Sequence, residues 1–176
     1  MASFEVLMLQ PGMPWMVERL ERRVTLRKLW EAADRDATLA VIAPNIRAVI
    51  STVDAPVDAA LMRRLPKLEI VVGFGVGYDH IDAAWAGQHG IVVTHTPGVL
   101  DEDVADLAIA LTLAATRRLP RAERYLREGH WPSAPYPLTA SLNGRVMGIL
   151  GLGRIGRKIA KRAEAFNLGV IYHDIR

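Results

Sequence analysis

The chain has 176 residues, of which 51% are hydrophobic and 23% charged, a composition typical of a globular protein with one large or two small domains. It contains no cysteine, which excludes disulfides, thiolate metal sites and cysteine nucleophiles, and no apolar stretch reaches membrane-spanning length. The net charge of +3 comes from basic residues interleaved with acidic ones, so we expect a solvated surface, no nucleic-acid or membrane partner, and a cytoplasmic location.

The N-terminal run carries Glu5 and lacks the basic start of a signal peptide, so it predicts a first strand. Further short apolar strands alternate with helices along the chain. The expected strands are 5–9, 48–52, 69–72, 91–94, 146–150 and 170–172, and the expected helices include 14–22, 58–65 and 82–88. This alternation favours an α/β fold with parallel sheets covered on both faces.

A glycine-rich segment, Gly73-Phe-Gly-Val-Gly-Tyr-Asp-His-Ile-Asp82, directly follows one expected strand. Three glycines in five residues let the backbone bring its N–H groups close to a ligand, forming a small anion nest suited to a carboxylate. A tight connection between strand and helix explains the same residues. The segment alone favours that second interpretation.

A domain boundary is expected near the turn His95-Thr-Pro-Gly98. Three acidic residues, Asp101, Glu102 and Asp103, then open a long helical run through Leu119, and they suit the positive end of the helix dipole. Asp101 is a good candidate for the N-cap. We therefore expect one α/β lobe at residues 1–98 and the beginning of a second at 99–176.

The sequence Gly151-x-Gly153-x-x-Gly156 follows an apolar strand and opens a helix, and a second strand leads to Asp174. Gly151 permits the tight turn, Gly153 allows close approach of a pyrophosphate, and Gly156 lets the helix pack closely on the sheet. The free N–H groups of the helix N-terminus favour an anion, and an acid at 174 can accept hydrogen bonds from a ribose. This arrangement is typical of the first half of a dinucleotide-binding fold.

The helix that follows Gly153 is amphipathic and basic. Its expected apolar face consists of Ile155, Ile159, Ala163 and Phe166. Its basic residues are expected largely on the opposite, outward face and are Arg157, Lys158, Lys161 and Arg162.

Four segments in this order and spacing resemble the D-isomer-specific 2-hydroxyacid dehydrogenases, and among them the glyoxylate and hydroxypyruvate reductases. They are 73–82, Ile91-Val-Val-Thr-His-Thr-Pro-Gly-Val-Leu100, Val104-Ala-Asp-Leu107 and Gly148-Ile-Leu-Gly-Leu-Gly-Arg-Ile-Gly156, and the resemblance runs from about Leu65 to the end. It implies NAD(P)-dependent interconversion of a 2-oxo acid and its D-2-hydroxy acid. It also implies two Rossmann-like lobes with parallel sheets, a flavodoxin-like substrate-binding lobe and the first half of an NAD(P)-binding Rossmann domain, and a homodimer.

The resemblance also assigns residues to the two sites. Val76 and Gly77 would offer backbone N–H groups to the substrate carboxylate, and Val104 would lie near the nicotinamide. The residues expected at the pyrophosphate are Gly151, Gly153, Arg154, Ile155 and Gly156. Asp174 is expected at the adenosine ribose. The family's catalytic arginine, glutamate and histidine are expected beyond residue 176, so no catalytic residue is assigned and this stretch by itself is expected to be inactive.

The five histidines are scattered without metal-ligand spacing, and we expect none of them to act as a catalytic base or a metal ligand. His95 lies where members of the family often have asparagine, and this departure is expected to alter the hydrogen bonding of the turn.

The acid at 174 favours NAD over NADP, because a carboxylate binds the ribose diol and repels a 2′-phosphate. Arg176 could instead partner that phosphate, so NADP is possible. Two other functions stay open. One is a non-catalytic, dinucleotide-sensing or corepressor-like protein of the same fold, and the other is a small binding or dimerisation module that ends at Arg176.

Overall fold

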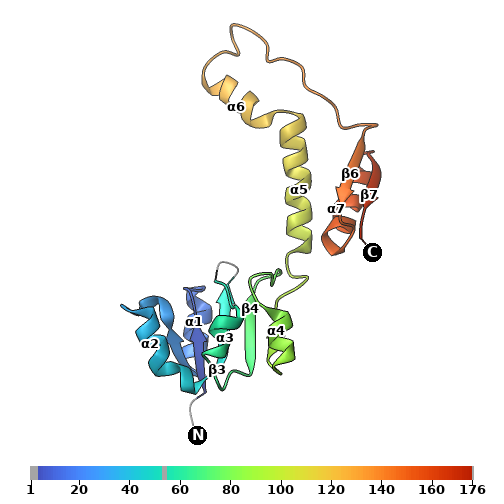
Figure 1. The fold of residues 1–176 in the computed structure, drawn as a ribbon. Helices are drawn as coiled ribbons and strands as arrows, with labels where there is room; N and C mark the ends of the chain where they lie inside the picture. Colours follow the sequence, from blue (N-terminus) through green and yellow to red (C-terminus); the bar gives the residue numbers. More distant parts are fainter. Residues whose placement is uncertain (1–3, 53–54, 176) are drawn as a thin grey trace. The chain divides into compact units, whose positions relative to one another are not determined.

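The computed structural model describes residues 4–52 and 55–175 (Figure 1). It divides into two compact units, unit 1 with residues 1–99 and unit 2 with residues 100–176. The elements of unit 1 are β1 (Glu5–Met8), α1 (Pro14–Glu21), β2 (Thr25–Lys28), α2 (Arg35–Ile42), β3 (Ile46–Thr52), α3 (Ala59–Arg63), β4 (Ile70–Phe74), α4 (Ala83–Gln88) and β5 (Val92–Thr94). Those of unit 2 are α5 (Asp101–Thr116), α6 (Leu119–Arg127), β6 (Val146–Leu150), α7 (Arg154–Ala165) and β7 (Gly169–His173).

Unit 1 contains a five-stranded parallel sheet with the strand order β2-β1-β3-β4-β5. This is the order of the flavodoxin-like doubly wound fold, and it confirms the predicted fold class. In a parallel sheet the carboxyl ends of all strands meet at one edge. The segment after β4 and the turn after β5 therefore follow neighbouring strands at this edge, where doubly wound folds bind their ligands.

The core of unit 1 lies on both faces of the sheet. Along β1, Leu7 belongs to one apolar cluster, whereas Val6 and Met8 belong to the other, as expected for a strand buried on both sides. Helix α1 covers the face of Val6 and Met8, and α2, α3 and α4 cover the face of Leu7. The alternating pattern of apolar residues thus fixes which face each helix covers.

Three helices of unit 1 begin at an aspartate that caps the N-terminus. The side chains of Asp34, Asp58 and Asp82 each accept a hydrogen bond from the N–H three residues later, at 3.0, 2.8 and 3.0 Å. The predicted helices 58–65 and 82–88 are thus confirmed, except that the first residue of each is the cap and that the first of them ends at Arg63.

Two elements of unit 1 were absent from the prediction. Strand β2 is the edge of the sheet, and its sequence Thr-Leu-Arg-Lys lacks the apolar run of a central strand. An edge strand needs no such run, because one of its sides faces solvent and tolerates charged residues. Here Arg27 pairs with Glu5 at 2.8 Å and Lys28 pairs with Glu21 at 2.6 Å. Helix α2 buries one leucine, Leu39, so its apolar signal is weak.

In unit 2, the single helix predicted from 101 to 119 was wrong. Helix α5 ends at Thr116, and Arg118 adopts a left-handed conformation with φ of 51° before α6 begins at Leu119. Pro120 explains the break, because a proline has no N–H to donate to the carbonyl four residues earlier, that of Thr116, and its ring clashes with that carbonyl. Asp101 was also misplaced: Leu100 is the N-cap, and Asp101 is the first helical residue.

Strands β6 and β7 of unit 2 pair in parallel, and α7 connects them, while α5 packs along α7. The basic residues of α7 were expected largely on its outward face, but two of the four contact α5. Lys158 pairs with Glu102 of α5, and Arg162 pairs with Glu102 at 2.8 Å and with Asp106 at 2.5 Å. Phe166 follows the end of the helix and is exposed.

In the described part of the chain, every helix is too short or too polar to cross a lipid bilayer.

Candidate functional site

The turn between β6 and α7 is closed by its own glycines. Gly151 has a φ of 88°, in the region that favours glycine, and its N–H continues the sheet by donating to the carbonyl of His173 at 2.8 Å. A β-carbon on Gly156 would lie 2.1 Å from the carbonyl oxygen of Gly151. Any residue larger than glycine at 156 would therefore push the first turn of α7 away from the strand.

Free N–H groups gather at the N-terminus of α7. The first bond of the helix runs from the N–H of Arg157 to the carbonyl of Gly153, at 3.0 Å. Within the described residues, the N–H groups of Gly153, Arg154, Ile155 and Gly156 donate to no protein acceptor. A β-carbon built on Gly153 meets no atom within 4 Å. The turn thus presents donors, the positive end of a helix dipole and open space, which together fit a pyrophosphate.

Asp174 follows β7 directly and lies beside the glycine-rich turn. Its Oδ2 accepts a hydrogen bond from the N–H of Leu152, so the carboxylate is held against the turn between Gly151 and Gly153. The structure thus brings Asp174 together with 151–156, the arrangement needed for a ribose next to a pyrophosphate. Arg176, the predicted partner of a 2′-phosphate, lies outside the described residues.

Arg154 and Asp101 face each other between the turn and α5. Asp101 is 5% exposed, and its Oδ2 lies 3.7 Å from Nε of Arg154. The carboxylate of Asp101 is thus directed at Arg154, the first residue of α7 after the glycine-rich turn. Val104 lies one turn further along α5, is 37% exposed and donates its N–H to Leu100 at 3.0 Å.

Hydrogen bonds from Lys158 and then from Arg162 hold the pKa of Glu102 below its usual value. Bonds to Asp106 and Glu102 raise the pKa of Arg162. Both charges are therefore retained over the neutral range, and they attach α7 to α5. This attachment orients the helix whose N-terminus carries the free N–H groups.

The other predicted site residues, Val76 and Gly77, lie in unit 1 directly after β4. Val76 is half-buried and Gly77 is exposed, and within the described residues neither N–H has a protein acceptor. A β-carbon on Gly77 would lie 3.2 Å from Oδ2 of Asp79. The two adjacent donors can bind the two oxygens of a carboxylate.

The prediction from the sequence did not include the contact that braces this segment. Nδ1 of His95 lies 2.8 Å from the carbonyl oxygen of Val76, and its ring lies 4.9 Å from that of Tyr78. The sequence predicted that His95 would alter the hydrogen bonding of its own turn, but it did not predict that Val76 would be the partner. The contact arises because β4 and β5 are neighbours, which sequence spacing alone does not specify.

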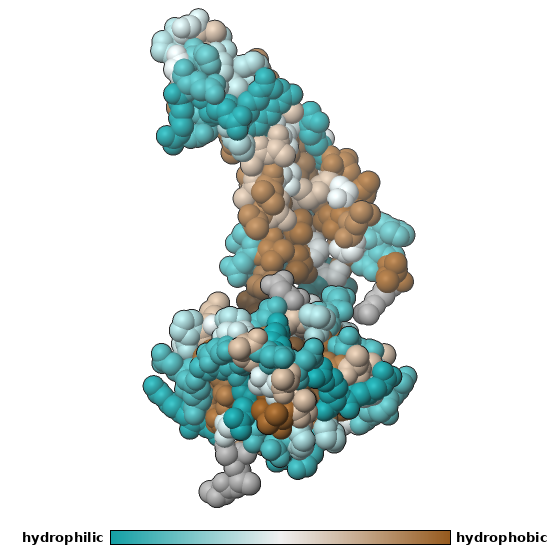
Figure 2. Space-filling model, turned by 60° about the vertical axis from the view of Figure 1, so that its left-hand side comes forward, coloured by the Kyte–Doolittle hydropathy of each residue, from teal (hydrophilic) through white to brown (hydrophobic). Residues whose placement is uncertain are grey.

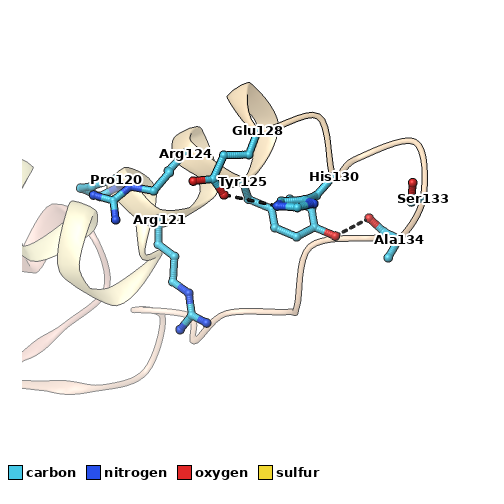
Figure 3. A pocket seen from close by; sticks show the side chains of 8 residues that line it. All are labelled: Pro120, Arg121, Arg124, Tyr125, Glu128, His130, Ser133 and Ala134. Atoms are coloured by element: carbon cyan, nitrogen blue, oxygen red, sulfur yellow. Dashed lines mark hydrogen bonds and ion pairs between the residues drawn. The ribbon is translucent and has the colours of Figure 1, made fainter.

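A separate hollow of about 620 Å³ lies at α6 and the loop after it (Figure 3). Its lining includes Arg121, Arg124, Glu128 and His130, all exposed, while the hydroxyl of half-buried Tyr125 donates to the carbonyl of Ala134 at 2.8 Å. None of the predicted site residues lines it. Its charges of both signs face solvent, so it presents no specific ligand chemistry.

Comparison with known proteins agrees with the sequence resemblance. Residues 6–167 match the family described as "D-isomer specific 2-hydroxyacid dehydrogenase, catalytic domain". The chain is 46% identical to glyoxylate/hydroxypyruvate reductase A of Arabidopsis thaliana over 99% of its own length and 56% of that protein. It is 44% identical to hydroxyphenylpyruvate reductase of Plectranthus scutellarioides, with 98% and 55% covered.

Solved structures show the same likeness. A 2-hydroxyacid dehydrogenase from Ketogulonicigenium vulgare superposes with a TM-score of 0.92 at 41% identity, covering 100% of this chain and 56% of that one. The NADPH-dependent glyoxylate/hydroxypyruvate reductase of Sinorhizobium meliloti, in complex with NADP and malonate, gives 0.84 at 37% identity, with 99% and 54% covered. The chain thus spans a little over half the length of each of these four relatives.

Proposed function

We propose that this chain, which belongs to the D-isomer-specific 2-hydroxyacid dehydrogenase family, takes part in the reduction of a small 2-oxo acid to its D-2-hydroxy acid with NAD(P)H. Glyoxylate or hydroxypyruvate is the proposed substrate. Reductases of these two acids recur among the relatives, which supports this choice. In this proposal residues 1–98 form the substrate-binding lobe and residues 99–176 begin the NAD(P)-binding domain.

The observation that carries the proposal is the closed turn at 151–156. Because a β-carbon at 156 would meet Gly151 at 2.1 Å while Gly153 faces open space, the turn is tight inside and accessible outside. We propose that the N–H groups from Gly153 to Gly156 bind the pyrophosphate, with Arg154 beside them and Val104 toward the nicotinamide. Bound NAD(P)H supplies the hydride for carbonyl reduction.

Val76 and Gly77 are proposed to bind the substrate carboxylate through their backbone N–H groups. Because these two N–H groups are already free in the structure, they could hold the carboxylate of the acid and leave its 2-oxo carbonyl free to react. No residue of this chain is assigned to the proton transfer that accompanies hydride transfer. The family's arginine, glutamate and histidine remain expected outside it.

Asp174 supports NAD as the preferred cofactor. Its carboxylate is fixed beside the turn by the N–H of Leu152, where it could accept hydrogen bonds donated by a ribose diol. A 2′-phosphate there would meet a negative charge. Titration of the intact protein with NADH and NADPH, followed by nicotinamide fluorescence, should show tighter NADH binding, and tighter NADPH binding would reverse the assignment.

We also propose a homodimer formed through the exposed apolar side of α5. Figure 2 shows apolar side chains gathered on α5, where Leu107 is 57% and Leu111 60% exposed. Exposed leucines one turn apart are typical of a helix that packs against a partner, and the family resemblance specifies a second copy. Light scattering should give twice the chain mass, and Leu107→Glu together with Leu111→Glu should give monomers.

The test of the function is NADH oxidation by the intact protein with glyoxylate and then with hydroxypyruvate. Saturable oxidation of NADH that depends on either acid supports the reductase. NADH binding without turnover of either acid, or of phenylpyruvate as a bulkier 2-oxo acid, would favour the non-catalytic, dinucleotide-sensing alternative. Absence of both binding and turnover would contradict the proposal altogether.

A further inference from the structure

We propose that His95 is a positioning residue that orients the N–H of Gly77 for the substrate carboxylate. This inference rests on the proposed role of Val76 and Gly77 in substrate binding. Its starting point is the hydrogen bond of 2.8 Å between Nδ1 of His95 and the carbonyl oxygen of Val76.

The geometry of the peptide group explains how a bond to one residue can orient the next. A carbonyl and the N–H that follows it belong to one rigid plane and point in opposite directions in a trans peptide. The structure describes no cis peptide bond. A donor that holds the carbonyl of Val76 therefore also fixes the direction of the N–H of Gly77, which points away from the donor.

The preceding peptide group is held in the same way. The backbone N–H of Thr96 donates to the carbonyl of Gly75 at 2.9 Å, and that carbonyl shares its plane with the N–H of Val76. Consecutive residues after β5 thus hold the consecutive peptide groups that carry the two free donors. The Thr96 contact uses only backbone, whereas the His95 contact depends on the side chain.

The chemistry of the pair settles which ring nitrogen carries a proton. A carbonyl oxygen only accepts, so Nδ1 of His95 must donate in this contact. A carbonyl that accepts a hydrogen bond also polarises its peptide group and makes the attached N–H a better donor. His95 therefore contributes both orientation and donor strength to Gly77.

Packing leaves the ring little freedom to turn away. His95 is half-buried, and its ring lies against Tyr78, which follows Gly77 directly, at 4.9 Å and an interplanar angle of 60°. The ends of the two strands are close, since a β-carbon on Gly73 would lie 3.3 Å from the carbonyl oxygen of Thr94 and 3.9 Å from Cβ of His95. The ring thus bridges β5 and the segment after β4.

Two substitutions separate the hydrogen bond from the packing. His95→Phe keeps a ring against Tyr78 but removes the donor. His95→Asn removes the ring but keeps an N–H donor. Its Nδ2, like Nδ1 of histidine, is bonded directly to Cγ and so lies at the same number of bonds from the backbone. The matched control is His89→Ala, because His89 also places Nδ1 2.8 Å from a carbonyl, that of Trp85, and stacks on a ring, but it caps the end of α4.

The experiment combines amide spectra and kinetics of the intact protein, with glyoxylate as the probe. In His95→Phe without ligand, we expect the amide nitrogen resonance of Gly77 to move, because its peptide carbonyl has lost a hydrogen bond. We also expect KM for glyoxylate to rise about five- to tenfold with kcat within about twofold, as for loss of one hydrogen bond that contributes to binding. His95→Asn and His89→Ala should stay within about twofold of the unsubstituted protein in both constants.

The outcomes separate the two levels of inference. If glyoxylate leaves the amides of Val76 and Gly77 unmoved in the unsubstituted protein and is not reduced, the proposed function fails. If glyoxylate is reduced but His95→Phe changes neither the Gly77 resonance nor KM, only the role of His95 is overturned. An effect of His95→Asn as large as that of His95→Phe would assign the role to the ring and would likewise overturn the hydrogen-bond explanation.

Discussion

The two glycine-rich segments look alike in the sequence, yet different forces hold them in place. The turn at 151–156 is closed by its own backbone, because Gly156 packs on Gly151 without space for a β-carbon. The segment at 73–82 instead depends on a neighbour, since His95 and Thr96 hold the carbonyls of Val76 and Gly75. Glycine is therefore a steric requirement at position 156 of the first segment, whereas at position 77 of the second it mainly serves to expose an N–H group.

The largest effect is expected for Gly156→Ala. The new methyl group would lie 2.1 Å from the Gly151 oxygen, so α7 must shift, which should lower the free energy of unfolding by about 3 kcal/mol or more and weaken NADH binding at least about tenfold. Calorimetry and NADH titration measure the two effects. Gly87→Ala is the matched control, because this helical glycine faces open space and the change should be neutral or stabilise by up to about 1 kcal/mol. Equal behaviour of the two variants would contradict steric closure at 156.

Gly153→Val separates the outer surface of the same turn from its interior. Space around Gly153 is open, so the protein should fold as before, while the side chain obstructs the approach of a pyrophosphate. We expect NADH affinity to fall by about tenfold or more, with the unfolding temperature changed by only about 2 °C. Unaltered NADH affinity would remove residues 151–156 from the proposed cofactor site.

Gly77→Ala tests the braced segment by the same kind of substitution. The backbone of Gly77 is not in the left-handed region, and the nearest atom to a new β-carbon is Oδ2 of the Asp79 side chain, at 3.2 Å. Because a side chain can move aside more easily than backbone, the cost in stability should be less than about 1 kcal/mol. KM for glyoxylate should rise by about threefold through crowding of the carboxylate. A loss of stability as large as that of Gly156→Ala would show that the two segments obey the same constraint.

The smallest effect is expected for Glu102→Gln and depends on pH. The pKa of Glu102 is lowered by Lys158 and Arg162, so its charge stabilises unit 2 above the pKa of the unfolded chain, and this contribution is lost as the pH falls through the folded value. Near pH 7 the variant should unfold about 2 °C or less below the unsubstituted protein, because these are exposed pairs. At pH 3 the two melting temperatures should converge. A constant difference at all pH values would assign the effect to packing instead.

The sequence predicted what depends on local pattern. Runs of apolar residues located four of the five strands of unit 1, β1, β3, β4 and β5, and both strands of unit 2. The spacing of three glycines and Asp174 located the turn at 151–156 beside which the structure places Asp174. It did not predict β2, because an edge strand can consist of half-polar residues paired by charge. The sequence also predicted that α5 continues to Leu119, whereas the helix ends at Thr116, which is four residues before Pro120.

Features that depend on a neighbour in space were missed for a different reason. Periodicity defined an apolar face of α7, but not that α5 would lie beside Lys158 and Arg162. The bond between His95 and Val76 likewise requires that β4 and β5 be adjacent, which follows from topology. The part of the candidate site that lies within one turn was therefore predictable, whereas the contacts that hold it in place were not.

The pairing of α5 with α7 has a consequence for the order in which the protein folds during synthesis. Arg162 and Glu102 are 60 residues apart, so the ribosome must complete α7 before α5 acquires its partner. Unit 1 closes within its first 99 residues and can fold as soon as they have emerged. The nascent chain thus carries a finished unit 1 while α5 still lacks its partner helix, with Ala105 and Ile109, which are buried in the folded unit, not yet covered.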